Sequence, residues 1–114
     1  MKAEHNERQT GVWVGEKKVA SIGVAIKSWV TYHGFALNVN TDLSYFSKIK
    51  PCGLESSTFT SMQALTGRSI DMDEVKAKVK RHFSDVFLRR LLMVDYEQMK
   101  IEPQLRGNYP EPQT

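Results

Sequence analysis

Alternating apolar and polar positions near the start of the chain predict β-strands. Residues 11–26, "GVWVGEKKVASIGVAI", divide into two apolar stretches on either side of Gly15-Glu16. That dipeptide fits a two-residue hairpin turn with glycine at its first central position. Residues 19–26 are rich in β-branched and small side chains, and Gly23 within them suggests a bulge or a point of close approach. We therefore expect two strands joined by a tight turn.

A third strand is predicted over residues 29–40, "WVTYHGFALNVN". Phe35, Leu37 and Val39 would share one face of this strand, because successive side chains point to opposite sides of a sheet. Gly34 is expected to interrupt it.

Helical spacing begins after the third predicted strand. In residues 41–49 the apolar residues recur every three positions, and Thr41 is a good N-cap. Pro51 should end this short helix, because the residue before a proline disfavours the α region. Residues 57–62, "STFTSM", are compatible with another short strand, and Gly67 with a turn.

The clearest helix is predicted to start at Asp71. Asp71 and Glu74 resemble a capping box, and they place acidic groups in the first turn, where the helix dipole favours them. Its apolar stripe consists of Val75, Val79, Phe83, Val86 and Phe87. Strands followed by helices indicate an α+β fold with a mainly antiparallel sheet. We expect a flexible leader over residues 1–10, a folded part over 11–102 and a flexible tail over 103–114.

Composition restricts the class of protein. With 114 residues, 40% of them hydrophobic and 25% charged, the chain has the composition of one ordinary globular domain. Its net charge of +3 is too small to indicate a nucleic-acid binder, and no apolar run is long enough to predict a membrane helix. The polar start lacks the apolar segment of a secretory signal, and a single cysteine cannot form an internal disulfide. These features predict an intracellular protein.

The single cysteine, Cys52, is the most interesting candidate for chemistry. It lies between Pro51 and Gly53 on a predicted loop, and loops often carry functional residues. A free cysteine is more often buried and inert, and a nucleophilic one needs a nearby base or cation. His33, Lys17 and Lys18 could serve, and spacing alone does not choose among them.

Metal and cofactor motifs are not found in the sequence. The three histidines are scattered, so no metal site is predicted. There is neither a phosphate-binding loop nor a dinucleotide fingerprint, so no cofactor is expected.

Three segments together resemble one enzyme family. They are "GEKKVASIG" (Gly15 to Gly23), "VTYHGFALNVNTDLSYFSKIKPCG" (Val30 to Gly53) and "TSMQALTG" (Thr60 to Gly67). They are similar to the second half of the lipoyl(octanoyl) transferases, also called octanoyl-ACP:protein N-octanoyltransferases or lipoate-protein ligase B. The middle segment is the most specific, because it matches a pattern of His-Gly-x-Ala-Leu-Asn-Val followed by Asp-Leu, Phe and Ile-x-Pro-Cys-Gly. The resemblance covers about residues 11–90, within the part expected to fold.

The resemblance implies an acyltransferase of lipoate biosynthesis. Such enzymes move an octanoyl group from acyl carrier protein to a lysine of lipoyl domains, such as those of 2-oxoacid dehydrogenase E2 subunits or the glycine cleavage H protein. The acyl group rests on a cysteine as a thioester, which corresponds to Cys52, and the family's catalytic lysine corresponds to Lys18. The family's substrate contacts correspond to Ser21, Ile22, Gly23, Gly34, Phe35 and Ala36. The implied location is the cytoplasm, or the mitochondrion in a eukaryote.

The chemistry implied by the resemblance is consistent. An ammonium beside a thiol favours the thiolate, and a lysine amine can also act as a base toward the incoming lysine. Transfer in two acylation steps is ordinary covalent catalysis. Glycines among the contact residues would let backbone approach the acyl chain and offer N–H groups to an oxyanion.

The chain departs from the family in one respect. The Arg-Gly-Gly and His-Gly-Pro-Gly-Gln segments of the family's upstream half do not occur. We therefore expect only part of the fold that the family shares with biotin protein ligases and class II synthetase-like domains. An open sheet edge and an uncovered apolar face would follow, so we expect the chain to self-associate, to bind the missing N-terminal half or to have repacked.

Two other functions are compatible with the sequence. The chain could be a non-catalytic fragment that binds acyl carrier protein or lipoyl domains. It could also bind nucleic acid through its basic helix, which would require salt-sensitive binding.

Overall fold

The computed structural model describes residues 1–6, 9–49, 54–95 and 97. The chain divides into two compact units, Met1–Val75 and Lys76–Thr114. The predicted nucleophile Cys52 and the predicted tail over 103–114 lie outside the described residues. Over the described part of the chain, no helix is both long and apolar enough to cross a membrane.

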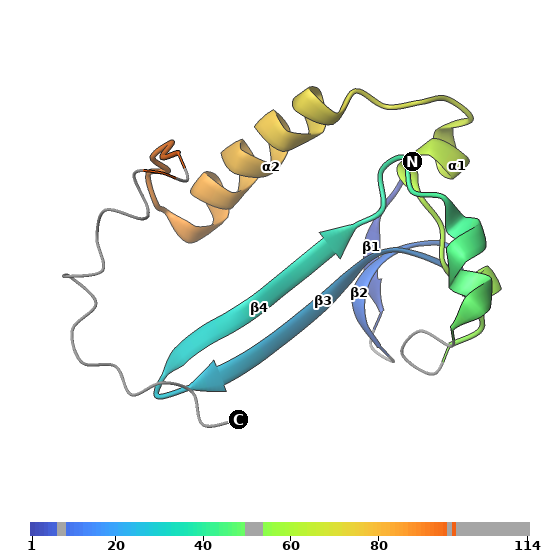
Figure 1. Cartoon of the computed structure of the whole chain (residues 1–114), viewed down its shortest axis with the longest axis horizontal. Coiled ribbons are helices and arrows are strands. Elements are labelled where there is room, and N and C mark those ends of the chain that lie inside the picture. Colours follow the sequence, from blue (N-terminus) through green and yellow to red (C-terminus); the bar gives the residue numbers. More distant parts are fainter. Residues whose placement is uncertain (7–8, 50–53, 96, 98–114) are drawn as a thin grey trace. The chain divides into compact units, whose positions relative to one another are not determined.

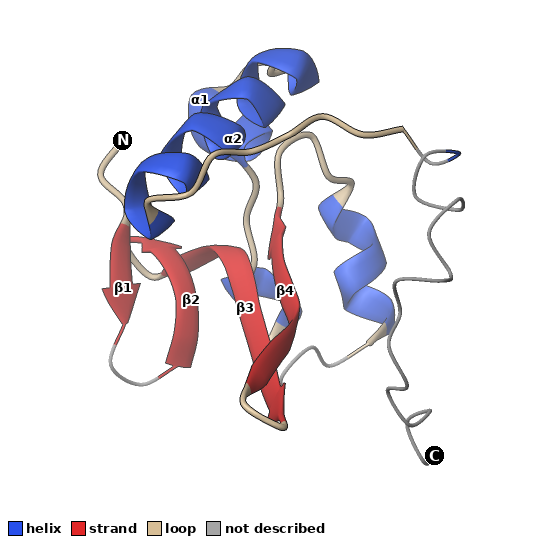
Figure 2. Cartoon of the chain, turned by 90° about the vertical axis from the view of Figure 1, so that its left-hand side faces the viewer, coloured by secondary structure: helices blue, strands red, loops and turns tan. Residues whose placement is uncertain are grey.

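A four-stranded antiparallel sheet lies in the first unit. The strands β1 (Glu4–Asn6), β2 (Gln9–Val14), β3 (Lys17–Lys27) and β4 (Val30–Leu37) lie side by side in chain order. Figures 1 and 2 show the four strands, with β3 and β4 continuing as a long hairpin beyond β1 and β2. The predicted α+β class with an antiparallel sheet is confirmed.

The first strand was not expected from the sequence. Residues Glu4–Asn6 pair with β2, and β2 itself begins at Gln9, so strands occupy part of the predicted leader over residues 1–10. A strand at a sheet edge is held by backbone hydrogen bonds and tolerates charged side chains. It therefore needs no apolar pattern that sequence analysis could detect.

The turn between β2 and β3 follows the predicted glycine chemistry, whereas the bulge of the sheet does not. Gly15 has φ 58° in the two-residue turn between β2 and β3, as predicted. Gly23 pairs directly with Gly34 in an unbroken β3–β4 register, so neither the predicted bulge at Gly23 nor an interruption at Gly34 exists. The register shift lies instead between Val12 and Trp13 of β2.

The segment after the sheet folds into short helices. A 3-10 helix, η1 (Leu43–Lys48), is capped by Asp42, whose carboxylate accepts from the Ser44 N–H at 3.0 Å, rather than by the predicted Thr41. Residues 57–62 do not form the predicted strand. They contain the end of the 3-10 helix η3 (Ser56–Thr58), a single parallel bridge at Phe59 and the start of α1 (Met62–Thr66).

Helix α1 is attached to the end of β4. The N–H groups of Met62 and Gln63 donate to the carbonyls of Asn38 and Val39 at 2.9 and 2.8 Å. At the other end of α1, Gly67 adopts φ 73°, which confirms the predicted turn at this residue.

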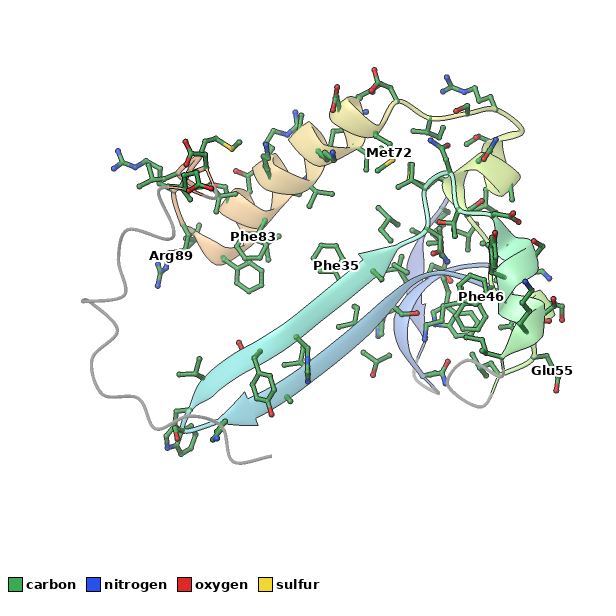
Figure 3. The ribbon with its side chains drawn as sticks, viewed as in Figure 1. Phe35, Phe46, Glu55, Met72, Phe83 and Arg89 are labelled. Carbon is green, nitrogen blue, oxygen red and sulfur yellow. The ribbon has the colours of Figure 1, made fainter. Side chains whose placement is uncertain are left out.

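The core of the first unit is small and lies at the root of the β3–β4 hairpin. Its buried apolar residues are Trp13, Val19, Ala20, Val39 and Phe59. The outer half of the hairpin is exposed, including Ile22, Val24, Ile26, Trp29, Val30, Tyr32 and Phe35. In Figure 3 the labelled Phe35 ring projects away from β4. Phe35 and Val39 were predicted to share one face of a strand, but Phe35 is exposed and Val39 is buried, because the strand ends at Leu37.

Helix α2 (Met72–Phe87) starts where the sequence predicts. The Asp71 carboxylate accepts from the N–H groups of Asp73 and Glu74 at 2.8 and 3.4 Å, which is an N-cap. Phe83 and Phe87 of its apolar stripe contact each other, with ring centroids 4.5 Å apart, and both are exposed.

Candidate active site

The predicted catalytic lysine is one of the most buried residues of the chain. Lys18 is only 2% exposed, which is unusual because lysine is rarely buried without a partner. Its Nζ donates to the side-chain oxygen of Gln9 at 3.3 Å and lies 5.8 Å from the centre of the Phe59 ring. That distance is within the range of a cation–π interaction. The buried ammonium is therefore held between β2 and the segment that follows η3.

The bulge between β2 and β3 decides which face Lys18 occupies. Val12 pairs with Ala20, but Trp13 pairs with Lys18, so β3 has one extra residue, Val19, at this point. Simple alternation would put Lys18 on the face of Ala20. Because directly paired residues share a face, the bulge instead places Lys18 on the face of Trp13.

The face of Lys18 continues onto small residues of the hairpin. Gly11 pairs with Ser21, Ser21 pairs with Ala36, and Gly23 pairs with Gly34. Four of the six predicted substrate contacts therefore share a face with Lys18: Ser21, Gly23, Gly34 and Ala36. No described atom lies within 4 Å of the point where a Cβ at Gly23 or Gly34 would stand.

The two remaining predicted contacts, Ile22 and Phe35, lie on the opposite face. They pair with each other across β3 and β4 and are 40% and 57% exposed. The structure thus does not bring all six predicted contacts to one surface. A role for Ile22 and Phe35 on the Lys18 face is limited to their backbone atoms.

The segment that follows the predicted nucleophile is fixed next to Lys18. The Thr60 N–H donates to the Lys18 carbonyl at 2.9 Å, and Phe59 forms a parallel bridge with Lys18. The neighbouring Lys17 donates from Nζ to the Ser57 carbonyl. Residues 57–60 therefore lie along the first residues of β3.

The segment that precedes the predicted nucleophile contacts Phe59 as well. Phe46 of η1 stacks on Phe59, with ring centroids 4.8 Å apart and an interplanar angle of 10°. Figure 3 shows the labelled Phe46 side chain pointing from η1 toward the strands. Residues 46 and 59, on either side of Cys52 in the sequence, are thus held together beside the Lys18 ammonium.

His33, the other base considered from the sequence, is not close to this centre along the sheet. It pairs with Val24 in the exposed half of the hairpin and has φ 72°, which is uncommon for a residue other than glycine. Its ring contacts that of Tyr32 at 4.6 Å. Across the described residues, no three His, Cys, Asp or Glu side chains are arranged to hold a metal ion.

Sequence reasoning missed the residues that surround the lysine. Gln9 carried no signal, because it fell in the expected leader, and Phe59 was assigned to a strand. Gly11 carried a usable signal, since a glycine inside a strand often marks close approach of another group. The structure shows that close approach: a Cβ at Gly11 would stand 2.5 Å from the Cε atom of Lys18.

Comparison with known proteins identifies the family of the chain. Residues 1–84 match the model of the lipoyl protein ligase A/B catalytic domain. The chain is 44% identical over 101 residues to an octanoyltransferase of Caldicellulosiruptor saccharolyticus, covering 88% of this chain and 43% of the relative. It is 59% identical over 78 residues to an octanoyltransferase of Solibacter usitatus, covering 68% of this chain and 34% of the relative. It is 51% identical over 89 residues to a probable octanoyltransferase of Pyrobaculum calidifontis, covering 78% of this chain and 39% of the relative.

The chain spans less than half the length of these curated relatives. The matched part nevertheless includes all the elements that surround Lys18, because the family model extends from residue 1 to residue 84. The chain therefore belongs to the family of lipoyl protein ligase A/B catalytic domains, and the relatives that it resembles within that family are octanoyltransferases.

Proposed function

We propose that this chain carries the cysteine–lysine centre of an octanoyltransferase. Its octanoyl donor would be acyl carrier protein, and its acceptor a lysine of a lipoyl domain, such as those of 2-oxoacid dehydrogenases or of the glycine cleavage H protein. The observation that carries the proposal is the burial of Lys18 beside the stack of Phe46 on Phe59, two residues that come before and after Cys52 in the sequence. The similarity to octanoyltransferases supports it independently.

The first step would load the acyl group onto Cys52. The thiolate attacks the carbonyl carbon of the donor thioester, a new C–S bond forms, and the carrier's thiolate leaves. The Lys18 ammonium favours the attacking thiolate and gives its proton to the departing thiolate. Lys18 is then left as a neutral amine.

The second step would pass the acyl group to the acceptor. The acceptor lysine, entering as its neutral amine, attacks the Cys52 thioester, a C–N bond forms and the C–S bond breaks. The neutral Lys18 amine takes the proton that the attacking nitrogen loses, which restores its ammonium beside the Cys52 thiolate. One lysine thus serves as acid and then as base, and the cycle consumes no external acid or base.

The acyl chain would lie over the small-residue face of the hairpin. Ser21, Gly23, Gly34 and Ala36 leave the backbone of β3 and β4 accessible on the side of Lys18. Backbone N–H groups there could stabilise the negative oxygen that develops in each step.

The direct test is intact-mass spectrometry of the chain after incubation with octanoyl-acyl carrier protein. The proposal predicts an octanoyl adduct that hydroxylamine removes, that is absent from Cys52→Ala and that accumulates more slowly in Lys18→Met. Lys27→Met, an exposed lysine of the same strand, is the matched control. Should no adduct form, the upstream part of the Caldicellulosiruptor octanoyltransferase is added as a separate chain.

A measurement without the octanoyl donor distinguishes a catalytic chain from a fragment that only binds. The rate of Cys52 alkylation by iodoacetamide is followed against pH in the unaltered chain and in Lys18→Met. A slower rate near neutral pH in Lys18→Met supports the pair. Equal curves for the two proteins would favour a non-catalytic fragment that binds acyl carrier protein or lipoyl domains.

A further inference from the structure

The acceptor that holds the Lys18 ammonium is a neutral amide rather than a carboxylate. Lys18 Nζ donates to Gln9 Oε1 at 3.3 Å in a site where the lysine is 2% exposed. Among the described residues, no buried side-chain nitrogen or oxygen lacks a hydrogen-bond partner. An amide oxygen can accept a hydrogen bond from an ammonium and also from a neutral amine. A carboxylate would strongly favour the ammonium and so oppose its loss of a proton.

The aliphatic stem of Lys18 lies over Gly11, the next residue of β2 on the face that carries Gln9. Gly11 is two positions from Gln9, so both face the lysine. A Cβ at Gly11 would stand 2.5 Å from Lys18 Cε and 2.6 Å from the Ala20 carbonyl oxygen, and Gly11 has φ 156°, a conformation that other residues rarely adopt. Gly11 therefore provides the space for the lysine stem, and Gln9 receives its head group.

The third residue of this face fixes the position of Gln9. Trp13 pairs with Lys18 and is 6% exposed, and its ring N–H donates to the Gln9 carbonyl at 3.3 Å. A hydrogen bond within β2 thus fixes the backbone of Gln9. Three alternate residues of β2 thus fix the lysine. Gly11 makes room for its stem, Gln9 accepts from its head group, and Trp13 holds the backbone of Gln9.

We propose that Gln9 is a positioning residue for the acyl transfer, and that it holds the Lys18 amine in place through both of its charge states. The inference rests on the proposed function, because positioning matters only if Lys18 exchanges protons. It assigns Gln9 no contact with the substrate. Gly11 is the structural condition for this arrangement, since any side chain there would displace the lysine.

The test compares two substitutions of Gln9 with one control. Gln9→Met keeps the length of the side chain and removes the acceptor. Gln9→Glu keeps its shape and makes the acceptor anionic. Thr10→Met, at the exposed neighbouring position, is the control, and far-UV circular dichroism checks the fold of each variant.

The first readout is the ¹H–¹⁵N NMR signal of the Lys18 side chain, which requires no substrate. A buried, hydrogen-bonded amine exchanges slowly enough to be seen, so the signal should be present in the unaltered chain, Gln9→Glu and Thr10→Met, and lost in Gln9→Met. A Lys18 signal that is unchanged in Gln9→Met would overturn the proposal. Lys18→Met provides the assignment.

The second readout is Cys52 alkylation against pH in the full chain. Gln9→Met should slow alkylation near neutral pH roughly fivefold, the factor that corresponds to one ordinary hydrogen bond. Gln9→Glu should move the whole curve to higher pH, because a second negative charge opposes the thiolate. Curves for both variants within twofold of Thr10→Met would refute the positioning role.

Failure of this inference and failure of the proposed function have different signatures. If Lys18→Met slows alkylation and the Gln9 variants do not, the cysteine–lysine pair stands and Gln9 does not position it. If Lys18→Met itself leaves alkylation unchanged, the pair fails, and the positioning role fails with it whatever the NMR signal shows.

Discussion

Replacing Gly11 by alanine should destabilise the chain far more than the same change at Gly23. The added Cβ would stand 2.5 Å from Lys18 Cε and 2.6 Å from the Ala20 carbonyl oxygen. Carbon atoms in contact normally lie about 3.5–4.0 Å apart, so the overlap is roughly 1 Å. The lysine stem can turn away, but the carbonyl belongs to the sheet backbone and cannot.

The expected cost follows from two terms. Overpacking costs about 1–3 kcal/mol, and a backbone conformation that alanine rarely adopts costs a further 1–3 kcal/mol or so. We expect Gly11→Ala to lower the free energy of unfolding by about 3 kcal/mol, a large part of the stability of a small domain. At Gly23 no described atom lies within 4 Å of the added Cβ. Gly23→Ala should therefore be neutral or stabilise by about 0.4–1 kcal/mol, because alanine restricts the unfolded chain.

Urea unfolding followed by tryptophan fluorescence measures both changes. Trp13 is 6% exposed and reports on the Lys18 site, whereas Trp29 is 99% exposed and is replaced by phenylalanine in all proteins to remove its signal. The midpoint for Gly11→Ala should fall by more than about 1 M. Equal midpoints for the two alanine variants would show that Gly11 does not make room for Lys18, and the reasoning would fail.

Three further predictions concern the surroundings of the site. Phe59→Ala should cost about 3–5 kcal/mol in urea unfolding, because this ring is 5% exposed; a loss below about 1 kcal/mol would contradict its place in the core. Asn40→Ala should speed hydrogen exchange of the Ile70 amide, since Asn40 Oδ1 accepts from it at 2.9 Å and Asn40 Nδ2 donates to the Ile70 carbonyl at 2.7 Å; unchanged exchange would refute the bridge. Hydrogen bonds from the Ser44 hydroxyl and N–H lower the pKa of Asp42 below its ordinary value of 3.8. The stability that this carboxylate contributes is therefore present above the unfolded-state pKa and is lost as the pH falls through the folded-state pKa. An NMR titration in which the pKa of Asp42 is not lowered would contradict this.

The local features of the fold could be predicted from the sequence. Gly15, Gly67 and Asp71 occupy the turn, the helix end and the helix cap that their chemistry favours. Each of these assignments depends on a few neighbouring residues, and the alternating pattern of residues 11–26 likewise needs only local order. The predicted antiparallel sheet followed from the order of such elements.

Features that depend on distant partners could not be predicted. Residues Glu4–Asn6 form a strand only because β2 is beside them. Phe59 looked like part of a strand, yet it meets β3 at a single bridge and otherwise packs on Phe46. Gln9 lay in the expected leader, and its importance becomes visible only when the register of β2 against β3 is known.

The bulge at Val19 connects the sequence pattern to the candidate site. Without it, Lys18 would share a face with Ala20 and Ile22, away from Gly11. The extra residue reverses the orientation of the lysine relative to the rest of β3, while the β3–β4 register remains unbroken from Ala20 onward. One irregular residue thus lets a single strand present a lysine and the small residues Ser21 and Gly23 to the same side.

That arrangement brings the lysine and the predicted small-residue contacts, which are close in the sequence, onto one face. A strand with strict alternation would place residues 18 and 21 on opposite faces, because they are separated by an odd number of positions. With the bulge they share a face and are neighbours on that face of β3. The segment from Lys18 to Gly23 can therefore supply both the proposed proton-transferring group and the bare backbone beside it, provided that the bulge is kept.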